Sequence, residues 1–261
     1  MGARSMAAGQ FCATSLRYDL HSHLLPAVDD GVRDWDDALK SVGILEQIGY
    51  QGAVTTPHIY PDLFNNKEAD LRIQFSELCA RVRLRYPNFS LALGAEYYFD
   101  DRLIDRIHSN PSNLLTFGTG QKFILIEFPR GYLPSDISGL LSTCKTHKLQ
   151  PIIAHVERYE YVQTDKAHLL LKTWMEEGAF IQMDLGAVAG QFGPEAEKTA
   201  MNILKMGGYH FIGTDMHTPH QGSRYYDLAW QRLEKSRHYF DETWHHQLID
   251  SPRKTFDSKC P

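Results

Sequence analysis

Short runs rich in aliphatic and β-branched residues alternate with longer helical patterns along most of this 261-residue chain. This alternation is typical of parallel strands joined by helices, because a parallel pair needs a crossover connection of a dozen or more residues. The resulting sheet is either open or closed into a barrel. We predict seven strands, at residues 16–20, 52–56, 90–95, 122–126, 151–154, 179–183 and 209–213.

The segments between these runs carry helical periodicity. Apolar positions from Trp35 to Ile48 follow the 3.6-residue period, and Gly49 is placed to end that helix. A second helix is predicted to begin at Asn65, with Glu68 three residues later completing a capping box. Further helices are predicted at 136–147, 165–177 and 194–206.

The domain organisation follows from the length of the chain and from its uniform composition. There is no linker rich in Gly, Ser or Pro, no block of like charge and no repeat. A chain of this length can bury one large α/β core. We therefore expect a single barrel domain at 16–250, preceded by a loose leader at 1–15 and followed by a tail at 251–261.

Composition excludes some partners and suggests a compartment. The net charge of -5 opposes a general affinity for nucleic acid or anionic membranes. The best apolar run, 123–128, is too short to span a bilayer and carries Glu127, so no membrane insertion is expected. The four cysteines form no CxxC pair and no disulfide-like framework, which indicates a reducing, cytoplasmic location. The oligomeric state is left open.

One cysteine imitates a catalytic motif. Cys79 and Arg85 have the Cys-x5-Arg spacing of cysteine-dependent phosphatases. That chemistry needs a loop of backbone amides around the phosphate, ahead of a helix N-terminus. The stretch lacks glycine and continues the helical pattern of Leu71, Phe75 and Leu78. We predict a helix here and no phosphate loop.

A histidine or a carboxylate follows every predicted strand. In parallel barrels the C-terminal ends of the strands meet at one face, where active sites lie. Any one such residue is more often a helix cap or a solvated side chain. That ordinary explanation would have to hold for nearly all seven strands at once, which favours a site. The residues at the strand ends are His21, His58, Glu96, Glu127, His155, Asp184 and Asp215.

Nine histidines and carboxylates near these ends form a candidate metal centre. A mononuclear site needs three or four ligands, so nine suggest two or three ions that share bridging carboxylates. Imidazoles and carboxylates without cysteine suit manganese, iron or zinc. Clustered divalent ions activate water and hold the oxygens of a displacement at phosphorus, which favours hydrolysis of a phosphate ester. The nine are His21, His23, Asp30, His58, Glu96, Glu127, His155, Asp215 and His217.

Six short motifs also resemble, in order, those of the polymerase-and-histidinol-phosphatase (PHP) superfamily. They are "DLHSHLLPAVDDG", "TTPHIYPD", "GAEYYFD", "ILIEFP", "AHVERY" and "TDMH". The closer match is the branch of bacterial manganese-dependent protein-tyrosine phosphatases linked to capsule and exopolysaccharide production. The resemblance covers residues 17–230. It implies a distorted (β/α)7 barrel, similar to a TIM barrel, with its active site at the C-terminal ends of the parallel strands.

The resemblance further implies up to three divalent ions, with Mn²⁺ favoured and Fe or Zn able to use the same ligands. Glu96 would be shared between two of them. The implied sets are His21, His23, Glu96 and Asp215 for one ion, Glu96, Glu127 and His155 for the second, and Asp30, His58 and His217 for the third.

Two arginines are implied to act on the phosphate. Arg158, in "HVERY", would bind it, since a guanidinium can meet two phosphate oxygens at once. Arg224 is a second candidate, in a longer loop that is harder to align. The family often has proline where this chain has Val156, and Ser-Asp-Ala-His in place of "TDMH". Neither departure removes a ligand.

The implied activity is that of a protein-tyrosine phosphatase acting on a bacterial tyrosine autokinase of polysaccharide biosynthesis or export. The ester would be hydrolysed directly by a metal-bridged hydroxide, without a covalent phosphoenzyme. A phosphatase of a small molecule such as histidinol phosphate needs the same metals and a tighter pocket. A metal-loaded but non-catalytic regulatory module is a third possibility, which the complete ligand set and Arg158 oppose.

Overall fold

The computed structural model describes residues 17–118 and 120–236, and its strands pair in parallel. They form a three-stranded and a six-stranded sheet. The first contains β1 (Arg17–Ser22), β2 (Tyr50–Thr55) and β4 (Ser90–Leu93), and the second contains β3 (His58–Ile59), β5 (Glu96–Tyr98), β6 (Lys122–Glu127), β7 (Leu149–Ile153), β8 (Phe180–Asp184) and β9 (Phe211–Gly213).

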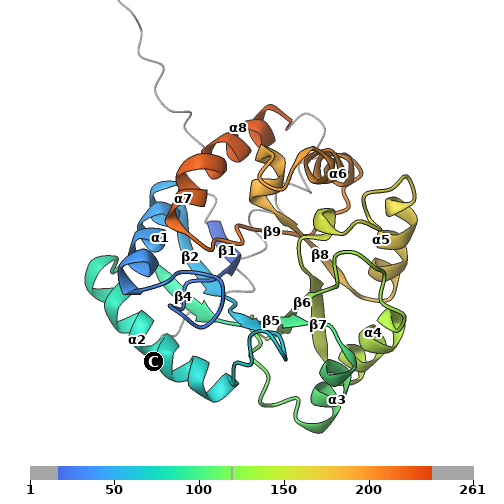
Figure 1. Ribbon diagram of the computed structural model, residues 1–261, viewed down its shortest axis with the longest axis horizontal. Coiled ribbons are helices and arrows are strands. Elements are labelled where there is room, and N and C mark those ends of the chain that lie inside the picture. The colour runs from blue at the N-terminus through green and yellow to red at the C-terminus, as the bar shows by residue number, and fades with distance from the viewer. Residues whose placement is uncertain (1–16, 119, 237–261) are drawn as a thin grey trace, which may run out of the picture.

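The two sheets are arcs of one barrel. Only two residues separate β2 from β3 and β4 from β5, so each pair is one strand with a short break, and nine segments reduce to seven strands. The chain after β9 closes the ring on β1, because the His23 amide donates to the Met216 carbonyl at 2.9 Å and the Asp215 amide to the His21 carbonyl at 2.8 Å. Figure 1 looks into this ring, with helices around it. The predicted seven-stranded α/β barrel is confirmed.

The helices follow the sequence pattern with small shifts at their ends. Five predicted helices are confirmed: α1 (Trp35–Gln47), α2 (Glu68–Arg85), α4 (Ile137–Thr146), α5 (Ala167–Glu176) and α6 (Pro194–Lys205). Three more helices were not predicted, namely α3 (Asp101–Ser109), α7 (Pro219–Gln221) and α8 (Asp227–Lys235).

The predicted capping box of α2 is wrong. This helix begins at Glu68, and its N-cap residue, Lys67, makes no side-chain capping bond. Glu68 is buried and forms a 3.0 Å ion pair with Arg106 of α3. The preceding Asn66 donates its side-chain amide to the carbonyls of Val28 and His58. The polar residues at this end therefore tie neighbouring loops together instead of capping the helix.

Cys79 and Arg85 both lie on α2, which confirms a helix in place of a phosphate loop. Cys144 is a free, buried thiol.

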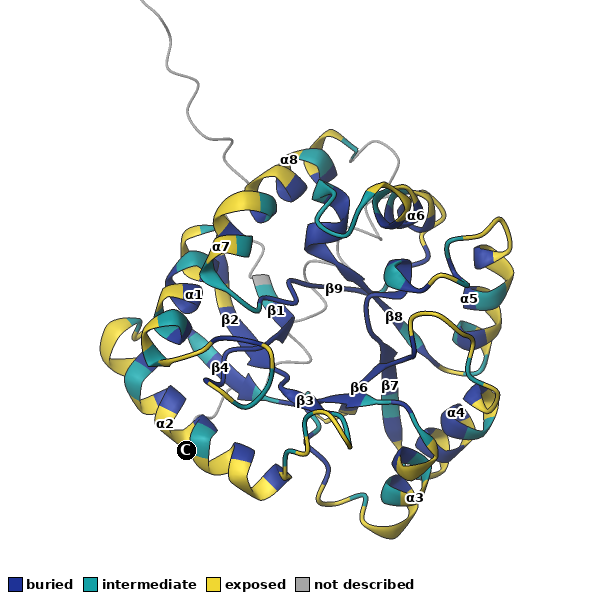
Figure 2. Ribbon diagram, in the orientation of Figure 1, coloured by how far each residue is buried: buried dark blue, intermediate teal, exposed yellow. Residues whose placement is uncertain are grey.

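Two apolar layers stabilise the barrel, one outside and one inside the ring of strands, and the side chains of β6 contribute to both. Ile124 and Ile126 belong to the large core between strands and helices, whereas Phe123 and Leu125 belong to a smaller cluster with residues of the other strands. Alternate residues of a strand point to opposite faces, so the smaller cluster fills the barrel interior. Figure 2 shows that the strands are mostly buried, whereas the helices around them expose their outer faces.

The predicted leader and tail lie outside the described residues, and the outer domain boundaries stay predictions. Across residues 17–118 and 120–236, no helix combines the length and the apolar character needed to cross a bilayer.

Candidate metal centre

The nine predicted ligands converge where the strands end. His21 lies near the end of β1, and His23 and Asp30 lie in the loop that follows. His58 and Glu96 are the first residues of the short strands β3 and β5. The remaining four are Glu127 at the end of β6, His155 two residues after β7, and Asp215 and His217 after β9.

Four of these side chains surround one point. The Nε2 atoms of His21 and His23 are 3.2 Å apart, and Glu96 Oε2 lies 3.0 Å from the first and 3.3 Å from the second. Asp215 Oδ1 lies 3.2 Å from both. Neighbouring ligands around a cation at about 2.1 Å are separated by roughly 3.0–3.4 Å. The four donor atoms therefore have the spacing of a metal coordination shell.

The far side of each imidazole is fixed by a partner that sequence reasoning missed. His21 Nδ1 lies 3.1 Å from Gln182 Oε1, and His23 Nδ1 lies 2.8 Å from Asp29 Oδ2. Each Nδ1–H can donate to its partner, which leaves the Nε2 lone pair facing the cluster. The strand period was a usable signal for Gln182, since it lies two residues before Asp184 on β8.

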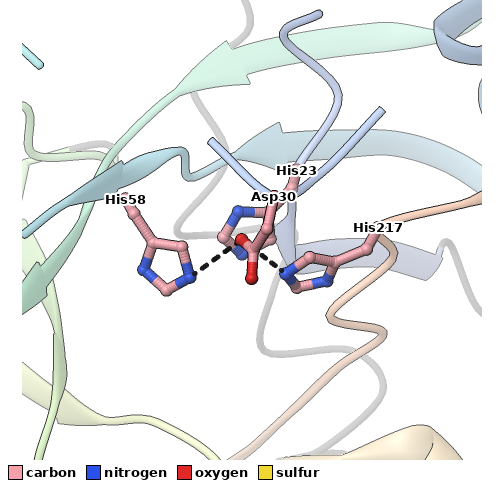
Figure 3. Close-up of side chains that lie close together, drawn as sticks. All are labelled: His23, Asp30, His58 and His217. Atoms are coloured by element: carbon pink, nitrogen blue, oxygen red, sulfur yellow. Dashed lines mark ion pairs between the residues drawn. The ribbon is translucent and has the colours of Figure 1, made fainter. Parts of the chain in front are cut away.

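A second group lies at the more open side of the cluster (Figure 3). Asp30 Oδ1 is 3.4 Å from His217 Nε2 and 3.6 Å from His58 Nε2. The His23 ring stacks on His217 with centroids 4.1 Å apart, so the structure adds His23 to the predicted set. The Asp30 side chain is 59% exposed, which makes this the side from which a ligand can enter.

A third group is built around Glu96. His155 Nε2 lies 2.9 Å from Glu96 Oε1, on the opposite oxygen from the one that faces His21 and His23. Glu127 approaches His155 Nε2 to 3.9 Å. Here the structure also brings in His58, whose Nδ1 is 3.3 Å from Glu96 Oε2. Glu96 is thus placed between two groups of potential ligands.

Backbone strain marks the same place. His155 and Asp215 have φ values of 30° and 48°, in the left-handed region that residues with a Cβ seldom adopt. Such conformations cluster at functional sites, where the surrounding structure enforces them. Each lies two residues after the end of a strand that the barrel holds in register.

The protonation pattern fits cation binding. Burial and the nearby Glu96 raise the pKa of Glu127 to about 8. Burial opposes a charge on His21, but Glu96 and Asp215 outweigh it and raise its pKa to about 9. Burial and Arg158 lower the pKa of His155 to about 3. Without an ion, protons therefore balance the buried carboxylates, and a divalent cation would take over that charge.

Arg158 lies beside the cluster. Its Nη1 atom pairs with Asp215 and lies 3.5 Å from Asp184 Oδ2, and its guanidinium stacks on Phe192 at 4.4 Å. Sequence reasoning missed Arg130, which is half exposed and places Nη2 3.7 Å from Glu127 Oε1.

Arg224 is less well placed. Its side chain is exposed and lies over the ring of its neighbour Tyr225 at 5.1 Å. Within the described part of the chain, it forms no ion pair with the nine clustered residues. Its role at the phosphate stays a prediction.

Fold and site together define an α/β barrel with a cluster of histidines and carboxylates, able to bind metal, at the C-terminal ends of its strands. The family model for capsular polysaccharide synthesis proteins CpsB/CapC matches residues 17–256, and the chain belongs to this family. The resemblance found in the sequence motifs is thereby confirmed.

Curated relatives carry consistent names. The chain is 26% identical over 200 residues to the tyrosine-protein phosphatase YwqE of Bacillus subtilis, covering 76% of each chain. It is 23% identical over 241 residues to the tyrosine-protein phosphatase CpsB of Streptococcus pneumoniae, covering 90% of this chain and 96% of that protein.

Solved structures show the same fold. A crystal structure from work on YwqE and CpsB, described as unique metal-dependent tyrosine phosphatases, superposes with a TM-score of 0.79 at 24% identity, covering 94% of this chain and 98% of that one. A variant of an organophosphorus hydrolase from Deinococcus radiodurans gives a TM-score of 0.55 at 14% identity, covering 92% and 93%. Both likenesses concern the barrel.

Proposed function

We propose that this protein is a metal-dependent tyrosine-protein phosphatase. The observation that carries the proposal is the position of Glu96, whose Oε1 faces His155 while its Oε2 faces His21 and His23. A carboxylate placed in this way can hold two ions at a fixed separation, as two-metal hydrolases require. The names of its relatives point to phosphotyrosine as the substrate.

The proposed ligands are those assigned by the sequence motifs. They hold up to three divalent ions, with manganese favoured over iron or zinc. An orphaned buried atom supports this fit: Asp215 Oδ1 lies 3.2 Å from Nε2 of both His21 and His23, yet it accepts no hydrogen bond of acceptable geometry in the described residues. The ligands are His21, His23, Glu96 and Asp215 for one ion, Glu96, Glu127 and His155 for another, and Asp30, His58 and His217 for the third.

Divalent ions bound there supply hydroxide at neutral pH and polarise the phosphate oxygens. The protein contributes the rest. Gln182 and Asp29 orient the imidazoles of His21 and His23. Arg158, held in place by Asp184 and Phe192, neutralises charge on the phosphoryl group during transfer. Cys79 takes no part, because it lies within α2.

The proposed partner is a tyrosine autokinase of capsule or exopolysaccharide biosynthesis, met in the cytoplasm. The family description supports the pathway. A phosphatase of a small molecule such as histidinol phosphate is the alternative that uses the same ions. A non-catalytic regulatory module would need no residue in the position of Arg158.

The test compares substrates with and without metal. We expect the manganese-loaded protein to hydrolyse a phosphotyrosine peptide much faster than histidinol phosphate, and a chelator to abolish the activity. Faster turnover of histidinol phosphate would favour the alternative. Metal binding without turnover of either substrate would favour the regulatory module.

A further inference from the structure

Three tyrosines lie at or after the ends of strands that carry proposed ligands. Tyr60 follows β3, Tyr98 ends β5, and Tyr132 follows β6. All three are at least partly exposed, and Tyr132 is 64% exposed. We call these three residues the tyrosine rim.

The strand register places the rim next to the proposed ligands. Tyr98 pairs with Glu127 across β5 and β6, and it lies two residues after Glu96 on the same strand. Tyr60 likewise lies two residues after His58. Residues two apart in an extended segment point to the same side, so the rim continues the face that carries the ligands.

The rings of the rim are organised rather than loose. Tyr60 and Tyr98 stack with centroids 3.8 Å apart and an interplanar angle of 5°. Phe64 extends the aromatic surface inward, because its ring stacks on the His58 imidazole at 5.4 Å. Because the Tyr60 and Phe64 backbones also exchange hydrogen bonds, these aromatic residues lie close to a proposed ligand.

The surroundings of the rim suit an amphiphilic ligand. Leu63, three residues after Tyr60, is 63% exposed, and Leu133, directly after Tyr132, is 47% exposed. Arg130, two residues before Tyr132, brings a positive charge to Glu127. Contact between water and a large apolar side chain is unfavourable, so exposed apolar residues often mark a binding surface. Here they lie beside a centre proposed to bind phosphate, which favours a ligand with an aromatic and an anionic part.

We propose that the tyrosine rim receives the phenyl ring of the substrate, and that it makes the site prefer aryl phosphates to alkyl phosphates. This inference rests on the proposed phosphatase function. Stacking against the Tyr98 and Tyr132 rings would hold the leaving phenol while its phosphoryl group lies over the metal centre. A phosphoserine side chain is too short and too polar to gain the same contact.

Binding of two phosphonates tests the rim without turnover. We expect calorimetry on the manganese-loaded protein to show tighter binding of phenylphosphonate than of methylphosphonate. Tyr132→Ala should weaken phenylphosphonate binding about 3- to 10-fold and leave methylphosphonate unchanged, since an aromatic contact is lost. Tyr98→Phe should retain the preference because it keeps the ring. Leu84→Ala, an 89% exposed apolar residue on α2, is the control.

Two results would overturn the rim: equal affinity of the unaltered protein for both phosphonates, or equal weakening of both by Tyr132→Ala. Tyr132 is exposed enough that its replacement should not impair folding. The proposed function fails separately. A manganese-loaded protein that prefers phenylphosphonate and does not hydrolyse a phosphotyrosine peptide would contradict the enzyme and retain the rim as a binding surface.

Discussion

The two ends of the barrel interior are built from the same strands and have opposite chemistry. On β6, Phe123 and Leu125 fill the interior near the start of the strand, and Glu127 faces the metal centre at its end. On β8, Phe180 packs against the interior cluster, whereas Gln182 and Asp184 reach the site. One inward face thus changes from apolar to ionisable within a few residues.

This difference separates stability from function. Phe123 forms edge contacts with Phe180 and Phe211 at 5.6 and 5.7 Å, which stabilise the barrel by burial. At the other end, burial raises the pKa of Glu127 to about 8 and that of Asp184 well above its usual range. The site end therefore stores unfavourable electrostatic energy, and we expect a bound cation to relieve it.

The largest effect on stability is expected at the apolar end. Phe123→Ala removes a ring that is 2% exposed and should lower the free energy of unfolding by about 3–5 kcal/mol. Urea unfolding followed by circular dichroism measures it. Leu169→Ala, at a 56% exposed position, is the control and should change little. Equal effects of the two changes would show that the interior cluster does not support the barrel.

At the site end, the largest effect is expected on turnover. Arg158→Ala should lower kcat/KM by roughly 30- to 1000-fold, which corresponds to about 2–4 kcal/mol of transition-state stabilisation. Steady-state assays with a phosphotyrosine peptide measure it, and Arg81→Ala on the outer surface of α2 is the control. A loss below threefold would mean that Arg158 serves mainly to pair with Asp184 and Asp215.

A smaller effect is expected one step away from the proposed ligands. Gln182→Ala removes the acceptor at His21 Nδ1 and should weaken metal binding about 10- to 100-fold. Competition with a chromogenic chelator measures the affinity. Gln182→Glu keeps an acceptor and should restore most of it. Unchanged affinity in Gln182→Ala would show that the barrel alone orients His21.

The smallest effect concerns pH and the metal-free protein. Between pH 6.5 and 9, His21 is protonated in the folded chain and neutral in the unfolded one, since its pKa is raised to about 9. Glu127, whose pKa is raised from 4.5 to about 8, is likewise protonated in the folded chain and ionised in the unfolded one between these two pH values. The folded state thus binds more protons, and stability falls as pH rises through this range.

A loss of about 1–3 kcal/mol corresponds to a fall in Tm of roughly 3–10 °C for a domain of this size. Thermal scans of the chelated protein at pH 6.5 and pH 9 measure it, and manganese should remove most of the difference. A Tm that rises with pH in the chelated protein would contradict the pKa directions of His21 and Glu127.

The same comparison explains what the sequence could predict. Toward the apolar end, apolar residues follow the strand period, and at the other end a histidine or carboxylate follows each strand. The barrel and the convergence of the nine side chains were therefore predictable. Gln182 could be suspected only from its place two residues before Asp184 on β8, and Asp29 not at all, because an amide or an acid that binds an imidazole through Nδ1 looks like an ordinary polar residue until the fold brings the two together.

The central claim is that nine side chains near the strand ends hold a polynuclear metal centre bridged by Glu96. The most direct measurement is the metal content of the purified protein by mass spectrometry, compared with Glu96→Ala and with the surface control Glu176→Ala. We predict two or three divalent ions per chain in the unaltered protein and the control, and a loss of at least two ions in Glu96→Ala. An unchanged metal content in Glu96→Ala would contradict the account.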